Sequence, residues 1–218
     1  AVIAQHHGDV FALRQCPAMA RPHGNPIQTR NLSAGATRQT DIADVMPISA
    51  AEQLLIEYIN RARLDPLGEA ERFGISLNEG LSAGTISADP KQPVAPNAEL
   101  ERAAVNHSRW MLSTDTFSHT GVGGSSPGDR MEAANYAFTG RWGWAENISY
   151  RASTGSVSEI ANAPSHHRGL FESSGHRVNI LRDEATEIGM GLETGRFSNG
   201  RDWNATMLTE KFAFAGDK

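Results

Sequence analysis

Three residues of the 218-residue sequence have the side-chain types and the surroundings of a metal or acid–base site. His119 lies in Phe-Ser-His-Thr-Gly, Glu146 in Trp-Ala-Glu-Asn-Ile-Ser, and His176 in Ser-Ser-Gly-His-Arg-Val-Asn-Ile-Leu. Two imidazoles and a carboxylate can hold a divalent cation such as zinc, or can move a proton. We therefore expect His119 and His176 to be metal ligands and Glu146 to be an acid–base residue, provided that the fold brings them together.

The local sequence places both histidines outside helix interiors. Residues 117–127 are too rich in glycine for a regular element, so His119 is expected on a loop, where binding groups are common. His176 is expected near the start of a short helix, where the helix dipole disfavours imidazolium and keeps the ring neutral. Glu146 falls within a strand predicted over residues 142–150. The alternative for this carboxylate is a structural hydrogen bond to a backbone amide.

Three other histidines have simpler interpretations. His107 lies on or beside the apolar stripe of a predicted helix, so we expect a partly buried histidine with one hydrogen bond. His166 and His167 are neighbours on another predicted helix and point in different directions, so at most one of them can face a cleft. We expect both to be solvated histidines on the helix surface.

Arginines and serines near these motifs are expected to be structural. Arg130 and Arg177 could recognise an anion, but a surface position or a structural salt bridge is the expected role of each. Ser173 and Ser174 lack the strand–turn–helix surroundings of a nucleophilic serine, and helix capping explains them. Cys16 is the only cysteine, which excludes an internal disulfide and a zinc site of paired thiolates.

The elements that must position these residues follow from periodicity and helix-end signals. The first helix begins at Ser49 and Glu52, which have capping-box spacing, and stops at Asp65-Pro66. Further helices are predicted over 66–72, 97–113, 127–136 and 157–171, and strands over 142–150, 188–193 and 206–214, with the last two strands forming a hairpin. Helices that flank a small, mainly antiparallel sheet indicate an α+β fold.

Length and composition favour one main domain. A hydrophobic content of 39% in 218 residues suffices for one core, which we place in residues 48–218. Residues 1–47 contain four prolines and no sustained apolar period, which predicts an extended or irregular leader. A net charge of -5 argues against nucleic acid as a partner. No stretch is long and apolar enough for a membrane span, and no signal peptide is visible.

Six motifs in order resemble the landmarks of the CAP superfamily, which comprises cysteine-rich secretory proteins, antigen 5 and pathogenesis-related 1 proteins. They occur within residues 49–214, and the cysteine-poor, bacterial branch with an SCP-like domain is the most similar. The motifs are Tyr58-Ile59-Asn60-Arg61-Ala62-Arg63, Phe117-Ser118-His119-Thr120, Arg130 with Tyr136, Ala145-Glu146-Asn147-Ile148, residues 173–181, and Ile188-Gly189-Met190-Gly191.

This resemblance implies a three-layer α-β-α sandwich and a protein that is extracellular or periplasmic. It also implies a cleft in which His119 and His176 bind zinc or another divalent cation beside Glu146. Animal and plant relatives carry a second glutamate where this sequence has Ser173, and a tryptophan where it has Leu170. Glu172 is one position away from the expected glutamate, a rotation of about 100° around a helix. We therefore leave Glu172 out of the site.

Three functions are consistent with these features. The first is a secreted CAP-domain module that binds a cation in its cleft and takes an unknown small molecule, a lipid or a macromolecule as ligand. The second is a metal-dependent hydrolase in which His119 and His176 hold the metal and Glu146 is the base, although catalytic zinc normally has three protein ligands. The third is a structural module of the cell envelope with a vestigial cleft.

Overall fold

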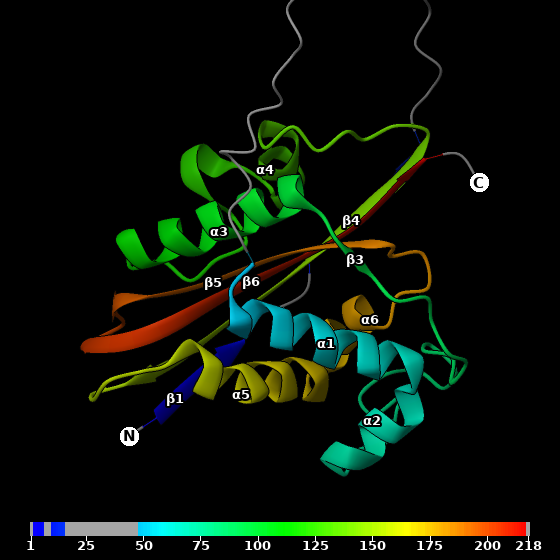
Figure 1. Ribbon diagram of the computed structural model, residues 1–218, viewed down its shortest axis with the longest axis horizontal. Coiled ribbons are helices and arrows are strands. Elements are labelled where there is room, and N and C mark those ends of the chain that lie inside the picture. Colours follow the sequence, from blue (N-terminus) through cyan, green and yellow to red (C-terminus); the bar gives the residue numbers. More distant parts are fainter. Residues whose placement is uncertain (1, 7–9, 16–47, 217–218) are drawn as a thin grey trace, which may run out of the picture.

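The computed structural model describes residues 2–6, 10–15 and 48–216. Figure 1 shows its helices and strands in their order along the chain. The α-helices are α1 (Ala50–Leu64), α2 (Pro66–Phe73), α3 (Ala98–Ser113), α4 (Pro127–Ala133), α5 (Glu159–Glu172) and α6 (Ser174–Ile180). The strands are β1 (Val2–His6), β2 (Val10–Gln15), β3 (Ala95–Pro96), β4 (Arg141–Ser153), β5 (Glu187–Ser198) and β6 (Asp202–Gly216).

A single sheet separates two layers of helices. Its strand order is β1-β4-β6-β5-β3, with β2 also paired to β4, and only the short β3–β5 pair is parallel. Helices α3 and α4 cover one face, and α1, α5 and α6 cover the other (Figure 1). This arrangement confirms the predicted α+β, three-layer α-β-α sandwich with a small, mainly antiparallel central sheet.

The predicted starts of α1, α2 and α3 are confirmed at residue level. The Ser49 side chain accepts from the backbone of Glu52, and the Glu52 side chain accepts from the backbone of Ser49, so the capping box is complete. Pro66 opens α2 after Asp65. Asn97 caps α3 by accepting from two backbone amides of its first turn.

Other boundaries differ from the predictions. Helix α4 ends at Ala133 rather than at residue 136, because Asn135 has a left-handed φ of 68° that cannot continue a helix. Strand β4 runs to Ser153 and is three residues longer than predicted at that end. Strands β1 and β2 lie in the predicted leader, and both pair antiparallel with β4. Cys16 lies outside the described residues.

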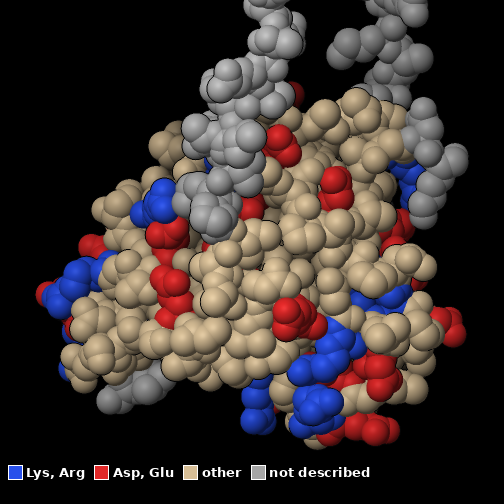
Figure 2. All heavy atoms as spheres, in the orientation of Figure 1, with Lys and Arg blue, Asp and Glu red and all other residues tan. Residues whose placement is uncertain are grey.

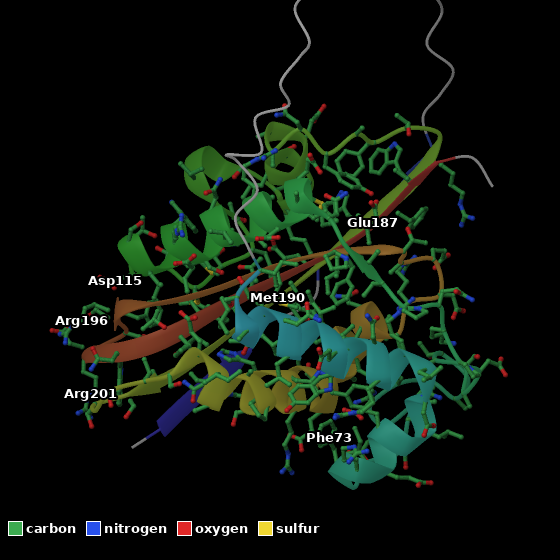
Figure 3. The ribbon with its side chains drawn as sticks, viewed as in Figure 1. Phe73, Asp115, Glu187, Met190, Arg196 and Arg201 are labelled. Atoms are coloured by element: carbon green, nitrogen blue, oxygen red, sulfur yellow. The ribbon has the colours of Figure 1, made fainter. Side chains whose placement is uncertain are left out.

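Side chains of β4 and β6 alternate between the two layers. Ile148 and Met207 pack with Met111 of α3, whereas Ala145 and Phe212 belong to the core under α1 and α5. Neighbouring residues in β4 therefore face opposite layers. Figure 3 shows side chains filling both layers, with Glu187 at the start of β5, where its carboxylate accepts from Tyr136 Oη at 2.6 Å.

Two glycines let α3 approach the sheet closely. A Cβ atom on Gly189 would lie 2.0 Å from the backbone carbonyl carbon of Leu100, and one on Gly191 would lie 2.3 Å from the backbone nitrogen of Val105. Both glycines belong to the Ile-Gly-Met-Gly motif noted in the sequence. The close packing of α3 on β5 explains why the motif needs glycine at these positions.

The surface has no broad field of one charge on the face drawn in Figure 2. Lys and Arg side chains are interspersed there with Asp and Glu side chains. Within residues that the structure describes, no helix has both the length and the apolar character to cross a membrane.

Candidate functional site

Glu146 is the centre of a buried cluster of charged groups. Its side chain leaves β4 on the α3 face and is fully buried. Its carboxylate accepts from Arg130 Nη2 at 2.8 and 3.0 Å, from Lys211 Nζ at 2.5 Å and from His119 Nδ1 at 2.9 Å. Burial alone would raise the pKa of Glu146, but the charge of Lys211, the hydrogen bond from His119 and the charge of Arg130 hold it far below the usual range. Glu146 is therefore ionised.

His119 is fixed from two sides on the loop between α3 and α4. Its carbonyl oxygen accepts from Arg130 Nη2 at 3.0 Å, and its ring is oriented by Glu146. An ionised carboxylate can only accept, so Nδ1 of His119 is the protonated nitrogen. Its Nε2 is buried and has no hydrogen-bond partner among the described residues. This carboxylate–histidine arrangement is the one that orients Nε2 toward a metal in known zinc sites.

His176 lies on the other side of the sheet. Its Nδ1 is 2.7 Å from Ser173 Oγ, and its carbonyl oxygen accepts from Asn147 Nδ2 at 3.3 Å. Asn147 follows Glu146 in β4, so the two side chains point to opposite faces. His119 and His176 thus approach β4 from opposite layers. Ser173 occupies the N-cap position of α6, as expected, but it makes no side-chain capping bond, and its Oγ contacts His176 instead.

A second buried acid that sequence reasoning missed lies on the His176 side of the sheet. Glu210 on β6 is fully buried, and its Oε2 accepts from Asn147 Nδ2 at 3.0 Å. Its Oε1 has no hydrogen-bond partner among the described residues. Burial raises the pKa of Glu210 to about 7, against the opposing effect of the Asn147 bond. The available signal was a glutamate in a predicted strand with Leu208 and Phe212 two positions away on the same face.

The side chains around His119 do not form a complete set of metal ligands. Within the described part of the chain, no three side chains of His, Cys, Asp or Glu gather closely enough to hold a cation. Arg130 and Lys211 pair with Glu146 beside His119. Both are cationic, so they disfavour a further positive charge nearby. His119 Nε2 fits a metal ligand by its orientation, whereas the cluster around it does not supply the rest of a coordination shell.

A cavity opens beside the Glu146 cluster, between α3 and α4. Its volume is about 200 Å³, and its lining residues are Arg102, Ala103, Asn106, His107, Trp110, Val122, Arg130, Ala133 and Ala134. His107 and Arg130 connect it to the cluster, because His107 Nε2 lies 3.8 Å and Arg130 Nη2 lies 2.8 Å from the Glu146 carboxylate.

His107 is a buried histidine, as the sequence predicted. Its Nε2 donates to the carbonyl of Ser118 at 3.0 Å, and its ring stacks on Trp110 with centroids 5.5 Å apart. Burial lowers the pKa of His107 to about 3, although Glu146 opposes this effect. His107 is therefore neutral near pH 7.

The prediction that His166 and His167 are solvated was wrong. Both are buried, with 0% and 1% of their surface exposed. His166 lies 2.7 Å from Ser149 Oγ and 2.9 Å from Thr206 Oγ1 on the sheet. His167 faces the other way and lies 2.7 Å from Glu69 on α2. The two rings point in different directions, as predicted. However, the sheet covers the side of α5 that carries His166, and α2 covers the side that carries His167.

The predictions for the arginines and for Glu172 had different outcomes. Arg130 closes a structural salt bridge with Glu146, as expected. Arg177 is fully buried and donates to backbone carbonyls, including those of Leu77 and Phe171. It is therefore not a surface residue, and it forms no salt bridge with another residue that the structure describes. Glu172 pairs with Arg168 at the surface of α5, away from the Glu146 cluster.

The solved structures to which this chain is similar include the following two. One is an extracellular protein containing an SCP domain from Bacillus anthracis, with 18% identity and a TM-score of 0.43, covering 77% of this chain and 44% of that chain. The other is an outer surface protein from Borrelia burgdorferi, with 13% identity and a TM-score of 0.47, covering 78% of this chain and 97% of that chain. This chain thus spans less than half of the first protein.

A search of curated proteins gave no significant match. The family model of the cysteine-rich secretory protein family, abbreviated CAP, matches residues 56–209. This range includes His119, Glu146 and His176, and it extends from α1 to β6. Because the match covers well over half of the sequence, the chain belongs to the cysteine-rich secretory protein (CAP) family.

Proposed function

We propose that this CAP-domain protein is a secreted binding module whose small-molecule ligand occupies the cavity between α3 and α4. The observation that carries the proposal is the position of this cavity of about 200 Å³ against the Glu146 cluster, through His107 and Arg130. Cavities with mainly apolar walls and a few convergent polar groups are the usual sites of small ligands. Secretion is supported by the family and by the extracellular and outer-surface proteins that the chain resembles.

The size of the cavity favours a compact ligand. A protein cavity of about 150 Å³ holds one benzene molecule. A cavity of about 200 Å³ therefore accepts one ring with a small substituent. A sterol or a long acyl chain would have to extend beyond it, so among the expected ligand classes we favour a small molecule over an enclosed lipid.

The electrostatics of Glu146 speak against the hydrolase alternative. A general base works best when its pKa lies near the working pH. The pKa of Glu146 is instead held far below the usual range, and its oxygens are already bonded to Arg130, Lys211 and His119. We propose that Glu146 orients His119 and Arg130 at the edge of the cavity and does not accept a proton from water.

Cation binding at His119 is a second candidate function. It is supported by the buried Nε2 atom of His119, which is oriented by Glu146 and has no partner among the described residues. Zinc titration by calorimetry of the wild type, His119→Ala and His176→Ala tests it. Loss of binding in both variants would support a shared site, and loss only in His119→Ala would support a site on one face of the sheet. Undiminished binding in His119→Ala would refute this candidate.

Binding in the cavity can be tested with a blocking substitution and a matched control. Ala133 is exposed and lines the cavity, whereas Ala137 is also exposed and does not. Single-ring fragments of mixed charge would be screened by NMR against the wild type, Ala133→Trp and Ala137→Trp. We expect fragments that shift the Trp110 indole signal in the wild type and in Ala137→Trp but not in Ala133→Trp. Equal shifts in all three proteins, or no binding fragment at all, would refute the proposed function.

A further inference from the structure

The buried cluster beside the cavity has more cations than anions. Arg130 and Lys211 both pair with Glu146, and the side chains of all three are at least nine-tenths buried. His107 is neutral, so it adds no charge to the cluster. Among the described residues, Arg130 and Lys211 each form an ion pair with this one carboxylate. The cluster therefore has at least one positive charge that no buried carboxylate balances.

An unbalanced buried cation is costly, and an anion placed next to it restores the balance. The behaviour of Lys211 agrees with a shortage of negative charge. Burial lowers its pKa to about 8, even though its Nζ atom lies 2.5 Å from Glu146. The lowered pKa still leaves Lys211 mostly protonated at pH 7. The neighbouring cavity is the space in which a balancing anion can be placed.

Two arginines in the cavity wall point to the same ligand charge. Arg130 lines the cavity and brings its positive charge to it, while its terminal nitrogens donate to Ser125, His119 and Glu146. Arg102 also lines the cavity, where one of its terminal nitrogens donates to the carbonyl of Ala134. A guanidinium has five N–H donors in a fork that suits carboxylates. Two arginines line the cavity, and it has no acidic residue in its wall.

The rest of the wall suits a flat apolar group. Ala103, Val122 and Ala134 contribute small or aliphatic side chains, and Trp110 contributes a half-buried indole that stacks on His107. Aromatic rings pack well against such a surface in offset or edge-on geometry. With room for one ring and a small substituent, this wall leaves little space for a second ring.

We propose that the cavity between α3 and α4 is selective for a small aromatic carboxylate, with its ring against Trp110 and its carboxylate toward Arg130 and Arg102. This inference rests on the proposed function, since it names the ligand class of the same cavity. The inference adds the charge of the ligand to the proposed function. Sugars, amines and neutral aromatics of equal size are expected to bind more weakly than the carboxylate.

A series of three planar probes separates charge from shape. Benzoate, benzamide and benzamidine have nearly the same size and carry charges of -1, 0 and +1. Calorimetric titration of the full chain at pH 7 and low salt should give the tightest binding for benzoate, roughly ten-fold tighter than for benzamide, as expected for a charge-assisted hydrogen bond. Benzamidine should bind most weakly, because it adds a cation to a cluster that already has an excess of them.

Arg102→Gln should lower the affinity for benzoate and leave that for benzamide nearly unchanged. Arg109→Gln is the matched control, since Arg109 lies on the same helix, is exposed, pairs with Glu193 and does not line the cavity. Equal affinities for benzoate and benzamide, or preference for benzamidine, would overturn the charge inference and leave the proposed function standing. Absence of binding by all three probes would overturn both.

Discussion

Replacing Glu210 by glutamine should stabilise the protein at neutral and basic pH. Glu210 is fully buried on β6, and only one of its oxygens has a hydrogen-bond donor, Asn147 Nδ2, among the described residues. Burial raises the pKa of this carboxyl from its usual 4.5 to about 7. Ionising Glu210 in the native protein therefore costs free energy, which an isosteric glutamine would not cost.

The sign and size of the effect follow from the two pKa values. The folded protein binds the Glu210 proton more tightly than the unfolded chain, so the stability contributed by this group is complete below pH 4.5 and is lost as the pH rises to about 7. Each pH unit between the two pKa values corresponds to about 1.4 kcal/mol, so the free energy of unfolding falls by about 3 kcal/mol in total. Glu210→Gln should match the wild type near pH 4 and exceed it by about 3 kcal/mol at pH 8.

Urea denaturation at intervals from pH 4 to pH 8.5, followed by circular dichroism, would measure the free energy of unfolding of both proteins. Their difference isolates Glu210 from other titrating groups. Glu132→Gln on α4 is the control, because Glu132 is exposed and its substitution removes the same charge. A difference between wild type and Glu210→Gln that stays constant across this range would refute the buried, proton-binding role of Glu210.

Three further substitutions test other parts of the account. Glu146→Gln leaves Arg130 and Lys211 buried without a counter-charge, so it should lower the free energy of unfolding by about 3–5 kcal/mol; a loss below about 1 kcal/mol in urea denaturation would contradict the charge count. Gly191→Ala should cost at least about 2 kcal/mol because its Cβ would overlap the backbone of α3, whereas Gly155→Ala, with no atom closer than 3.8 Å, should be nearly neutral in thermal unfolding.

The helices were predictable because their signals are local. The capping box at Ser49 and Glu52, the proline at Pro66 and the cap at Asn97 each act within one helical turn. The end of α4 was not predicted, because the left-handed conformation of Asn135 has no strong sequence signal. The pairing of β1 and β2 with β4 joins segments more than 100 residues apart, and periodicity contains no information on such contacts.

The candidate site was predictable in part. His119 and Glu146 belong to family motifs, and the structure brings them into direct contact. Lys211 gave no signal, because a lysine in a strand is usually solvated, and its partner on β4 is set by the register of the sheet. His166 and His167 were misjudged for a related reason: the burial of a helix on two sides depends on which elements cover it.

The most direct test of the central claim is a crystal structure of the protein soaked with benzoate at a concentration that saturates binding in solution. We expect electron density for the ring between Trp110 and the pair Ala133 and Ala134 at the end of α4, with the carboxylate within hydrogen-bond distance of Arg130 or Arg102. Density for benzoate only at another surface, with the cavity between α3 and α4 accessible in the crystal and empty of ligand, would contradict it.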